Sequence, residues 1–261
     1  MELGLKGRPA LVSAASKGLG RACAEALAAE GARVAICARD RGELEAARDE
    51  IAAETGATVV AITADVAEEP ERFVREGAEA LGGCEILVAN AGGPSPGRFD
   101  ELGDDDFRRA LDLLFFSTLR MTREALPSMR RAGYGRVVVV GSSAIKQPIP
   151  NLMLSNSVRA GVAGWAKTLS GELGPEGITV NLVLPGRYLT GRVRELHEDR
   201  AGREGRSPEE VAADDMRAIP LGRFGEPREL GDLAAFLASE RASYITGAVV
   251  QADGGLIASL L

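Results

Sequence analysis

A glycine-bearing turn near the start of the chain is the first place where residue types indicate chemistry. The turn consists of Ser13, Ala14, Ala15, Ser16, Lys17, Gly18, Leu19 and Gly20. It follows an apolar run and leads directly into a helical pattern, so its glycines let the backbone approach a phosphate at a helix N-terminus. Any tight turn from strand to helix can need glycine, so the turn alone is weak evidence of phosphate binding.

The elements that position this turn follow a regular alternation of short apolar runs and longer helical patterns. Strands are predicted at 9–14, 33–38, 58–63, 86–90, 136–141, 179–184 and 248–251, and helices at 18–30, 41–54, 69–81, 104–131, 155–173 and 227–239. Continuous apolar strands separated by helices indicate a parallel sheet covered on both faces. We therefore expect residues 1–261 to form one doubly wound α/β domain of the Rossmann type, with about seven strands.

Composition excludes several other classes of function. The net charge of −7 offers no basic stripe for nucleic acid, so no nucleic-acid partner is expected. Cys23, Cys37 and Cys84 are far apart and lack metal-ligand spacing, so no metal site is expected. Cys37 and Cys84 lie in apolar runs, and we expect these two to be reduced and buried. No signal-peptide pattern or membrane-length apolar run is present, so a cytoplasmic protein without a membrane partner is expected.

Further segments along the chain match one family in the right order. They are the 13–20 turn, Asp65-Val66, Asn90-Ala91-Gly92, Pro185-Gly186 with Thr190, Ile219-Pro220-Leu221-Gly222-Arg223 and Asp253-Gly254-Gly255. The chain thus resembles the short-chain dehydrogenase/reductases, in particular those of the 3-oxoacyl-acyl-carrier-protein reductase type. The resemblance implies that the turn binds the pyrophosphate of a nicotinamide dinucleotide, that Asp65-Val66 contacts the adenine, and that Pro185, Gly186 and Thr190 hold the carboxamide.

The first turn departs from the family pattern at two positions. Ser13 replaces a Thr and keeps the hydroxyl, whereas Ala14 replaces a Gly. The second change is acceptable if Ala14 avoids a positive φ, and we expect that it does.

Two cations favour NADP over NAD as the cofactor. The second strand ends without the acidic residue that would bind a ribose 2′-hydroxyl; Arg39 follows it and Lys17 lies in the glycine turn. Both suit a 2′-phosphate, although either alone would be an ordinary solvated charge. Asp40 is adjacent and argues against this assignment.

The resemblance breaks down where the family has its catalytic residues. The family uses a Tyr as the general acid or base, a Lys four residues later, a Ser after the fifth strand and an Asn on an earlier helix. Alignment without gaps over the 155–173 helix places Ser155 at the Tyr and Arg159 at the Lys, and alignment of the segment 110–114 places Leu114 at the Asn. Only the Ser is kept, as Ser143 or its neighbour Ser142. Arg159 can still bind the nicotinamide ribose, but an alkyl hydroxyl cannot deliver a proton as Tyr does.

Several groups could replace the missing proton donor. Lys146 lies on the loop that should border the nicotinamide, and Tyr188 lies in the Pro-Gly segment. For both, a structural role is the more ordinary interpretation. His197, the only histidine, stands among charges and is expected to be solvated. A water held by Ser143 and Asn156 is another possibility.

Two functions remain open from these residues. The favoured one is an NADP-dependent oxidoreductase acting on a small carbonyl or secondary alcohol, with a non-standard proton donor. The alternative is a catalytically inactive NADP-binding sensor or partner subunit, which the replaced catalytic positions would suit. Nothing singles out a lyase or an isomerase.

The remaining expectations concern substrate access and assembly. The segment 187–223 is charged, broken by Gly202, Gly205 and Pro208, and predicted to be a substrate lid. Its arginines, such as Arg192, could attract an acidic substrate, but nearby acidic residues offset them. Small residues on the 155–173 helix and an apolar C-terminus favour a homodimer or homotetramer.

Overall fold

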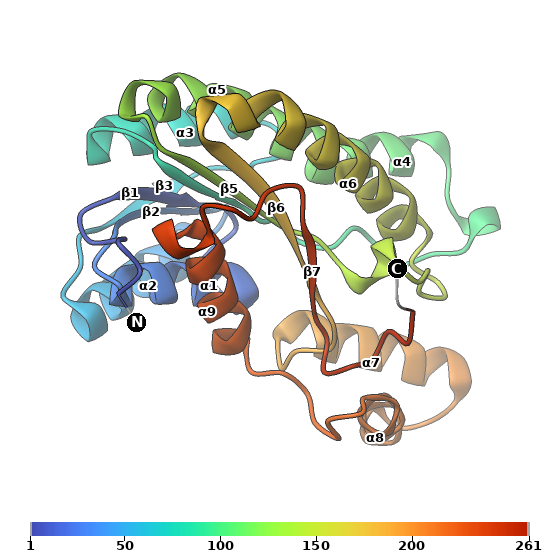
Figure 1. Ribbon diagram of the computed structural model, residues 1–261. Helices are drawn as coiled ribbons and strands as arrows, with labels where there is room; N and C mark the ends of the chain where they lie inside the picture. Colours follow the sequence, from blue (N-terminus) through green and yellow to red (C-terminus); the bar gives the residue numbers. More distant parts are fainter. Residues whose placement is uncertain (1, 260–261) are drawn as a thin grey trace.

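The computed structural model describes residues 2–259, and a parallel sheet lies at its centre (Figure 1). Its seven described strands are ordered β3-β2-β1-β4-β5-β6-β7, and every neighbouring pair is parallel. The strands are β1 Pro9–Val12, β2 Arg33–Ala38, β3 Val59–Thr63, β4 Ile86–Ala89, β5 Gly135–Val140, β6 Ile178–Pro185 and β7 Val249–Ala252. The predicted doubly wound α/β fold of Rossmann type is confirmed, and each strand overlaps its predicted segment.

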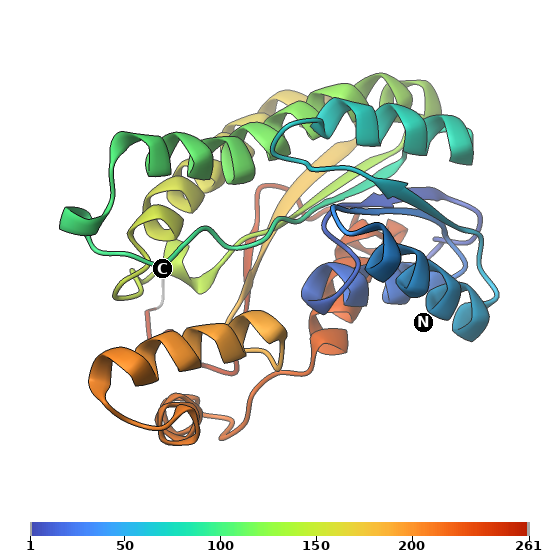
Figure 2. The same ribbon diagram turned by 180° about the vertical axis from the view of Figure 1, so that it is seen from behind.

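Helices cover both faces of this sheet, as Figures 1 and 2 show from opposite sides. The α-helices are α1 Gly18–Ala29, α2 Arg41–Thr55, α3 Pro70–Leu81, α4 Asp104–Leu111, α5 Ser117–Ala132, α6 Met153–Leu173, α7 Gly191–Glu204, α8 Pro208–Ala218 and α9 Pro227–Ala238. One layer contains α1, α2 and α9, and the other contains α3, α5 and α6. Short turns of helix lie at η1 Phe99–Glu101, η3 Ser143–Ile145, η4 Gly174–Glu176 and η5 Glu240–Ala242.

The apolar strands form two cores because side chains alternate between the two faces of a strand. In β2, Val34 and Ile36 pack into the core beneath α1, α2 and α9. Their neighbours Ala35 and Cys37 pack into the core beneath α3, α5 and α6. Both faces of the sheet are therefore buried, which explains why the strands are continuously apolar.

The predicted helix at 104–131 is interrupted in the structure. Between α4 and α5 the chain forms a π-helical stretch, η2, over Asp112–Phe116. At the start of α5 the hydroxyls of Ser117 and Thr118 donate back to the carbonyls of Leu113 and Leu114 in this stretch, at 2.5 and 2.9 Å. Such a bulge leaves the apolar periodicity of the sequence almost unchanged, so the pattern predicts one helix.

The segment 187–223 was expected to be irregular, but it contains α7 and α8. The Thr190 hydroxyl accepts a hydrogen bond from the Val193 N–H at 3.4 Å, which caps the start of α7. Ser207 and Glu210 form a capping box at the start of α8. In Figure 1 these two helices lie below the right-hand end of the sheet, and α4 and the start of α6 lie above them at the same end of the molecule.

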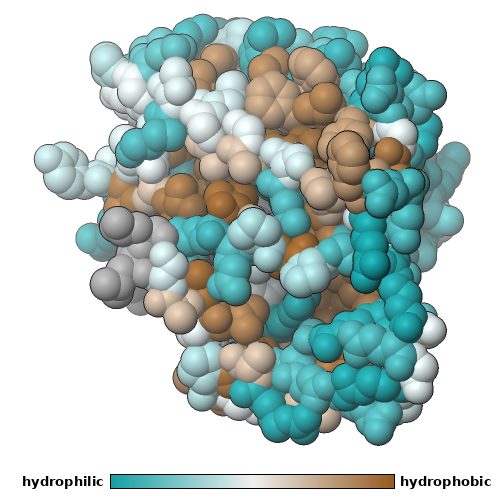
Figure 3. All heavy atoms as spheres, turned by 90° about the vertical axis from the view of Figure 1, so that its right-hand side faces the viewer, coloured by the Kyte–Doolittle hydropathy of each residue, from teal (hydrophilic) through white to brown (hydrophobic). Residues whose placement is uncertain are grey.

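Apolar side chains gather across the middle of the face at the right of Figure 1, and hydrophilic ones dominate its lower part (Figure 3). Among residues 2–259, no helix combines the length and the hydropathy that crossing a membrane requires.

The contact between α1 and α9 depends on a glycine. A Cβ on Gly231 would lie 2.4 Å from the Ala22 carbonyl oxygen, whereas a Cβ on Gly171, which is exposed in α6, would meet no atom within 4 Å. We predict that Gly231→Ala lowers the free energy of unfolding by about 2–3 kcal/mol, because the helices must separate. Gly171→Ala should raise it by up to about 1 kcal/mol. Urea unfolding measures both values, and equal effects would contradict the packing argument.

Candidate active site

The ends of β1 and β4 are joined by a buried serine. Ser13 is fully buried, and its hydroxyl donates to the Asn90 carbonyl at 2.7 Å and accepts from the Asn90 N–H at 2.9 Å. The Asn90 side chain then donates through Nδ2 to the Ala14 carbonyl at 3.1 Å. Ser13 was predicted to bind the cofactor, but the structure uses its hydroxyl to hold two strand ends together. Through this contact the Asn90 side chain helps to fix the shape of the turn at 13–20.

Ala14 adopts the positive φ that we expected it to avoid. Its φ is 49°, in the left-handed region, so that expectation is wrong. The cause is local: its carbonyl is held by Asn90, and the next N–H, that of Ala15, donates to the Cys37 carbonyl at 2.9 Å. A left-handed alanine costs about 1–2 kcal/mol, which the hydrogen bonds to β2 and β4 offset.

The rest of the turn is shaped to accept a phosphate at the N-terminus of α1. A Cβ on Gly20 would lie 2.3 Å from the Ala14 carbonyl oxygen and 2.6 Å from Nδ2 of Asn90, so only glycine fits there. Lys17, at the N-cap, makes no side-chain hydrogen bond to the helix, and the first turn of α1 has no acidic residue. The free N–H groups and the helix dipole are therefore left for an anion, which fits a dinucleotide phosphate. Ser16, Gly18 and Leu19 lie in this partly exposed turn.

The predicted 2′-phosphate cations both lie at the surface beside β2. Arg39 is 82% exposed, and its only described ion pair is a loose one of 3.9 Å with Asp65. Lys17 pairs with Glu43 at 3.2 Å. The Asp40 carboxylate accepts the Glu43 N–H at 2.8 Å and caps the N-terminus of α2. The acidic residue that argued against NADP is thus engaged in a helix cap.

Asp65 and Val66 follow β3, and the Asp65 carboxylate lies 3.9 Å from Nη1 of Arg39. The Asp65 carboxylate accepts the Ala67 N–H at 3.0 Å, so it shapes the turn in which it lies. Val66 is buried in the core under α3, α5 and α6.

Gly186 and Thr190, expected at the nicotinamide, already have structural roles. A Cβ on Gly186 would lie 2.6 Å from Cα of Asp253, so this glycine permits β6 to pack against the chain after β7. Thr190 caps α7, as described above. Pro185 is the last residue of β6, while Ala91 and Gly92 follow β4. All of them remain at the carboxyl ends of the strands.

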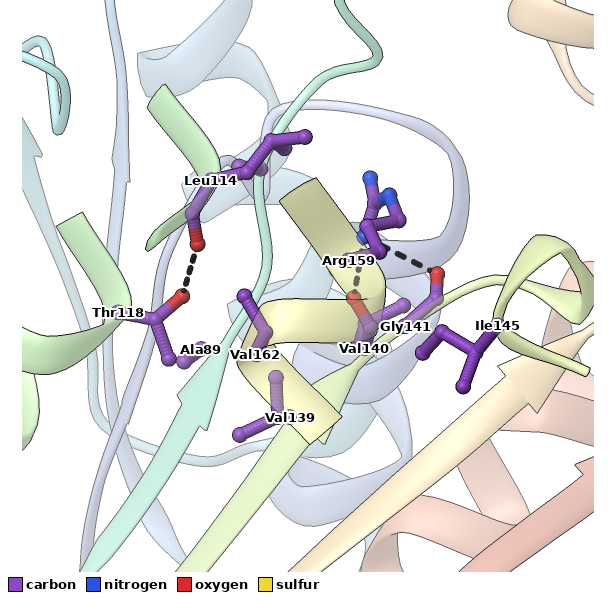
Figure 4. Close-up of a pocket in the computed structure, with 10 residues that line it drawn as sticks. Ala89, Leu114, Thr118, Val139, Val140, Gly141, Ile145, Arg159 and Val162 are labelled. Carbon is purple, nitrogen blue, oxygen red and sulfur yellow. Dashed lines mark hydrogen bonds between the residues drawn. The ribbon is translucent and has the colours of Figure 1, made fainter. Parts of the chain in front are cut away.

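The residues expected to carry out catalysis meet where β5 ends and α6 begins. Ser143 and Ser155 are buried, and Arg159 lies one helical turn after Ser155 on the same face of α6. Arg159 Nη1 donates to the carbonyls of Val140 and Gly141, at 2.9 and 3.1 Å (Figure 4). Burial, together with the positive charge of Arg192, lowers the pKa of Arg159 to about 10. The guanidinium therefore stays charged at neutral pH.

Hydrogen bonds distinguish the two neighbouring serines. Ser142 accepts the Ala144 N–H at 3.1 Å and caps η3. Neither Ser143 Oγ nor Ser155 Oγ makes a hydrogen bond to the described part of the chain. Ser143 is therefore the serine with a hydroxyl available to a substrate oxygen.

A small cavity of about 10 Å³ lies against Arg159 (Figure 4). A cavity of this volume holds roughly one water molecule. Leu114, Ile145 and Val162 line it. Thr118, which also lines it, donates its hydroxyl to the Leu114 carbonyl at 2.9 Å (Figure 4). Sequence alignment placed Leu114 where the family has Asn, and the structure puts that side chain beside the arginine.

The alternative proton donors are engaged elsewhere. Lys146 Nζ donates to Gln251 Oε1 at 2.7 Å, which ties η3 to β7. The Tyr188 hydroxyl donates to the Ala252 carbonyl at 2.9 Å, and burial raises its pKa to about 12. Asn156 makes two hydrogen bonds with the Ile149 backbone, so its amide holds the loop before α6.

His197 was expected to be solvated, and that expectation is wrong. It is 7% exposed, its Nε2 lies 3.1 Å from Oδ2 of Asp215, and its ring faces Phe224. Arg187 and Arg200 also bind Asp215, both at 3.2 Å. The histidine therefore helps to join α7 to α8.

The site contains one further residue whose position the sequence pattern does not reveal. Arg192, on the first turn of α7, donates through Nη2 to the Pro94 carbonyl at 2.7 Å. This contact joins the 187–223 segment to the loop after β4 and brings a second arginine near Arg159. Spacing along the chain offers no signal for a contact between residues so far apart.

Comparison with known proteins identifies the family. Residues 13–257 match the family model described as enoyl-(acyl carrier protein) reductase. The chain is 32% identical to a short-chain type dehydrogenase/reductase of Sinorhizobium fredii, over 97% of this chain and 98% of that protein. It is 31% identical to the 3-oxoacyl-[acyl-carrier-protein] reductase of Aquifex aeolicus, over 98% of this chain and 100% of that protein.

A solved structure agrees with this comparison. The L-sorbose reductase of Gluconobacter frateurii, complexed with NADPH and L-sorbose, superposes with a TM-score of 0.94 at 30% identity and covers 100% of both chains. The fold, the glycine-bearing turn at 13–20 (called the phosphate turn below) and these similarities agree, and the chain belongs to the short-chain dehydrogenase/reductase family.

Proposed function

We propose that the protein is an NADP-dependent oxidoreductase that transfers hydride between the nicotinamide and a carbonyl or secondary-alcohol carbon. One observation carries the proposal: the phosphate turn, Asn90 and Ser143 follow β1, β4 and β5, three adjacent parallel strands. The carboxyl ends of such strands form the ligand-binding edge of an open α/β sheet. The dinucleotide and the serine hydroxyl would therefore meet on one edge.

The preference for NADP rests on charge at the end of β2. Lys17 and Arg39 are exposed cations, and the Asp40 carboxylate is engaged by the α2 backbone. A 2′-phosphate would compete with Glu43 and Asp65 for these cations, and phosphate carries the greater charge. The complex of L-sorbose reductase with NADPH shows this cofactor in a protein of the same fold.

The reaction would proceed without the family's tyrosine. When bound, NADPH supplies the hydride. Ser143 would donate a hydrogen bond to the substrate oxygen and so stabilise the negative charge that develops there. Ser155 is too weak an acid to protonate an alkoxide as Tyr does, so water would deliver the proton. The segment 187–223 would cover the substrate, because Arg192 already connects it to the loop after β4.

A homodimer or homotetramer would use the exposed face of α6. Ala160, Gly161 and Gly164 are exposed there, and a Cβ on Gly164 would meet no atom within 4 Å. Phe116, at the end of the neighbouring π-helical stretch, is 38% exposed. Small residues beside an exposed aromatic ring suit close packing against a second copy.

Cofactor choice can be tested by titrating the protein with NADPH and NADH in a calorimeter. We predict tighter binding of NADPH, and a loss of about tenfold in its affinity for either Lys17→Ala or Arg39→Ala, because each removes a charge-assisted hydrogen bond. NADH affinity should change less than about twofold. Arg41→Ala is the matched control, since Arg41 is equally exposed but pairs with Glu45. Equal affinity for both dinucleotides would refute the assignment.

The role of Ser143 can be tested by kinetics on any ketone that the protein reduces. We predict that Ser143→Ala lowers kcat by about 100-fold without changing NADPH affinity, because one stabilising donor is lost. Ser155→Ala should lower kcat by less than about threefold, because that hydroxyl is too weak an acid to be the proton donor. Ser157→Ala, on the exposed side of α6, is the control. A larger effect at Ser155 than at Ser143 would reverse these roles.

A further inference from the structure

Arg159 carries a positive charge that no acidic side chain neutralises. Among residues 2–259, none of the ion pairs includes Arg159; its Nη1 is held by the Val140 and Gly141 carbonyls alone. Neutral carbonyls reduce the cost of burying a guanidinium but do not cancel its charge. The net charge of the chain is −7, so acidic residues are abundant elsewhere.

The rest of this guanidinium is free to bind a ligand. Its other nitrogens point away from the two carbonyls in Figure 4, and no hydrogen bond in the described chain uses Nε or Nη2. Around it, Leu114 and Ile145 offer only apolar side chains. Two parallel N–H donors in this arrangement match a carboxylate.

A second arginine extends toward the same place from α7. Arg192 donates to the Pro94 carbonyl, and a Cβ on Gly93 would lie 2.8 Å from its Nε. Its ion-pair partner is Glu195, which is 66% exposed and 3.3 Å away, so the pair is weak. The charge of Arg192 is close enough to contribute to the lowered pKa of Arg159. Arg159 is held at the end of β5, and Arg192 is held by the loop after the neighbouring strand β4, so both arginines lie at the same edge of the sheet.

The phosphates of the cofactor have other sites. The diphosphate would bind the uncapped N-terminus of α1, and a 2′-phosphate would bind Lys17 and Arg39 beside β2. Arg159 lies instead where β5 ends, next to Ser143. Resting on the function proposed above, we propose that the substrate is an oxo acid whose carboxylate is bound by Arg159 from α6 and by Arg192 from the segment that covers the site.

The test compares acids with their neutral esters, without requiring turnover. Pyruvate, 2-oxobutyrate and acetoacetate, each beside its methyl ester, are titrated into the protein saturated with NADP⁺, so no hydride is available. For at least one pair the acid should bind about tenfold more tightly than the ester, as charge-assisted hydrogen bonds imply. In Arg159→Gln and in Arg192→Gln this ratio should fall to about one. Arg75→Gln, an exposed arginine on α3, should keep it.

Three outcomes would overturn the inference: no acid binds more tightly than its ester, the ratio survives both substitutions, or Arg159→Gln weakens NADP⁺ binding while the ratio stays unchanged. The last outcome would assign the charge to the cofactor. A thermal melt shows whether Arg159→Gln is folded. If it is not, the ratio of acid to ester affinity is measured in Arg159→Lys, which keeps the charge but loses the two parallel N–H donors, and in Arg192→Gln. An undiminished ratio in both variants overturns the inference.

Turnover separates this inference from the proposed function. NADPH oxidation is followed with the same acids and esters. A preference for acids in binding with no NADPH oxidation would contradict the oxidoreductase and leave the carboxylate site standing. Equal turnover of acids and esters would support the oxidoreductase and contradict the carboxylate site.

Discussion

The hydrogen bonds between Ser13, Ala14 and Asn90 are the constraint on which the site depends. Strands β1 and β4 are neighbours in the middle of the sheet, and the buried Ser13 hydroxyl joins their carboxyl ends through both backbone groups of Asn90. The Asn90 side chain then holds the Ala14 carbonyl, which keeps the first turn beneath α1. The hydrogen bonds offset the strain at Ala14 and fix the turn that leads into the N-terminus of α1.

The same edge explains why the sequence predicts some parts of the molecule well. Strands buried on both faces must be apolar throughout, so their runs of Val and Ile are visible without a structure, and their order along the chain predicts the doubly wound sheet. The sequence also predicts the turn at 13–20 from its glycines, which lie between a strand pattern and a helix pattern. The sequence explains only in part why glycine is needed there. Gly20 is required because a side chain would clash with the Ala14 carbonyl and the Asn90 side chain, which come together only in the fold.

Other features depend on contacts that no local pattern encodes. The helix around Asp112–Phe116 has an unbroken apolar period, so its π-helical stretch was missed. Helices α7 and α8 are stabilised by their N-caps and by ion pairs such as that of Arg200 with Glu204, and they lack a broad apolar stripe that the sequence pattern would reveal. The burial of His197 follows from Asp215, eighteen residues away on another helix. Each of these differences arises where tertiary contacts override the local sequence pattern.

Charge, rather than shape, distinguishes the two ends of the site. At the β2 end, Lys17 and Arg39 are solvated and have carboxylates near them, so a phosphate that binds there displaces weak surface pairs. At the β5 end, Arg159 is half-buried and has only backbone carbonyls, so an anion that binds there meets a charge with no competitor. An anion at the β5 end would therefore gain the larger electrostatic free energy, since desolvated charges interact more strongly than solvated ones. Arg159 therefore differs from the two surface cations in what surrounds its charge, although all three lie near the carboxyl ends of strands of one sheet.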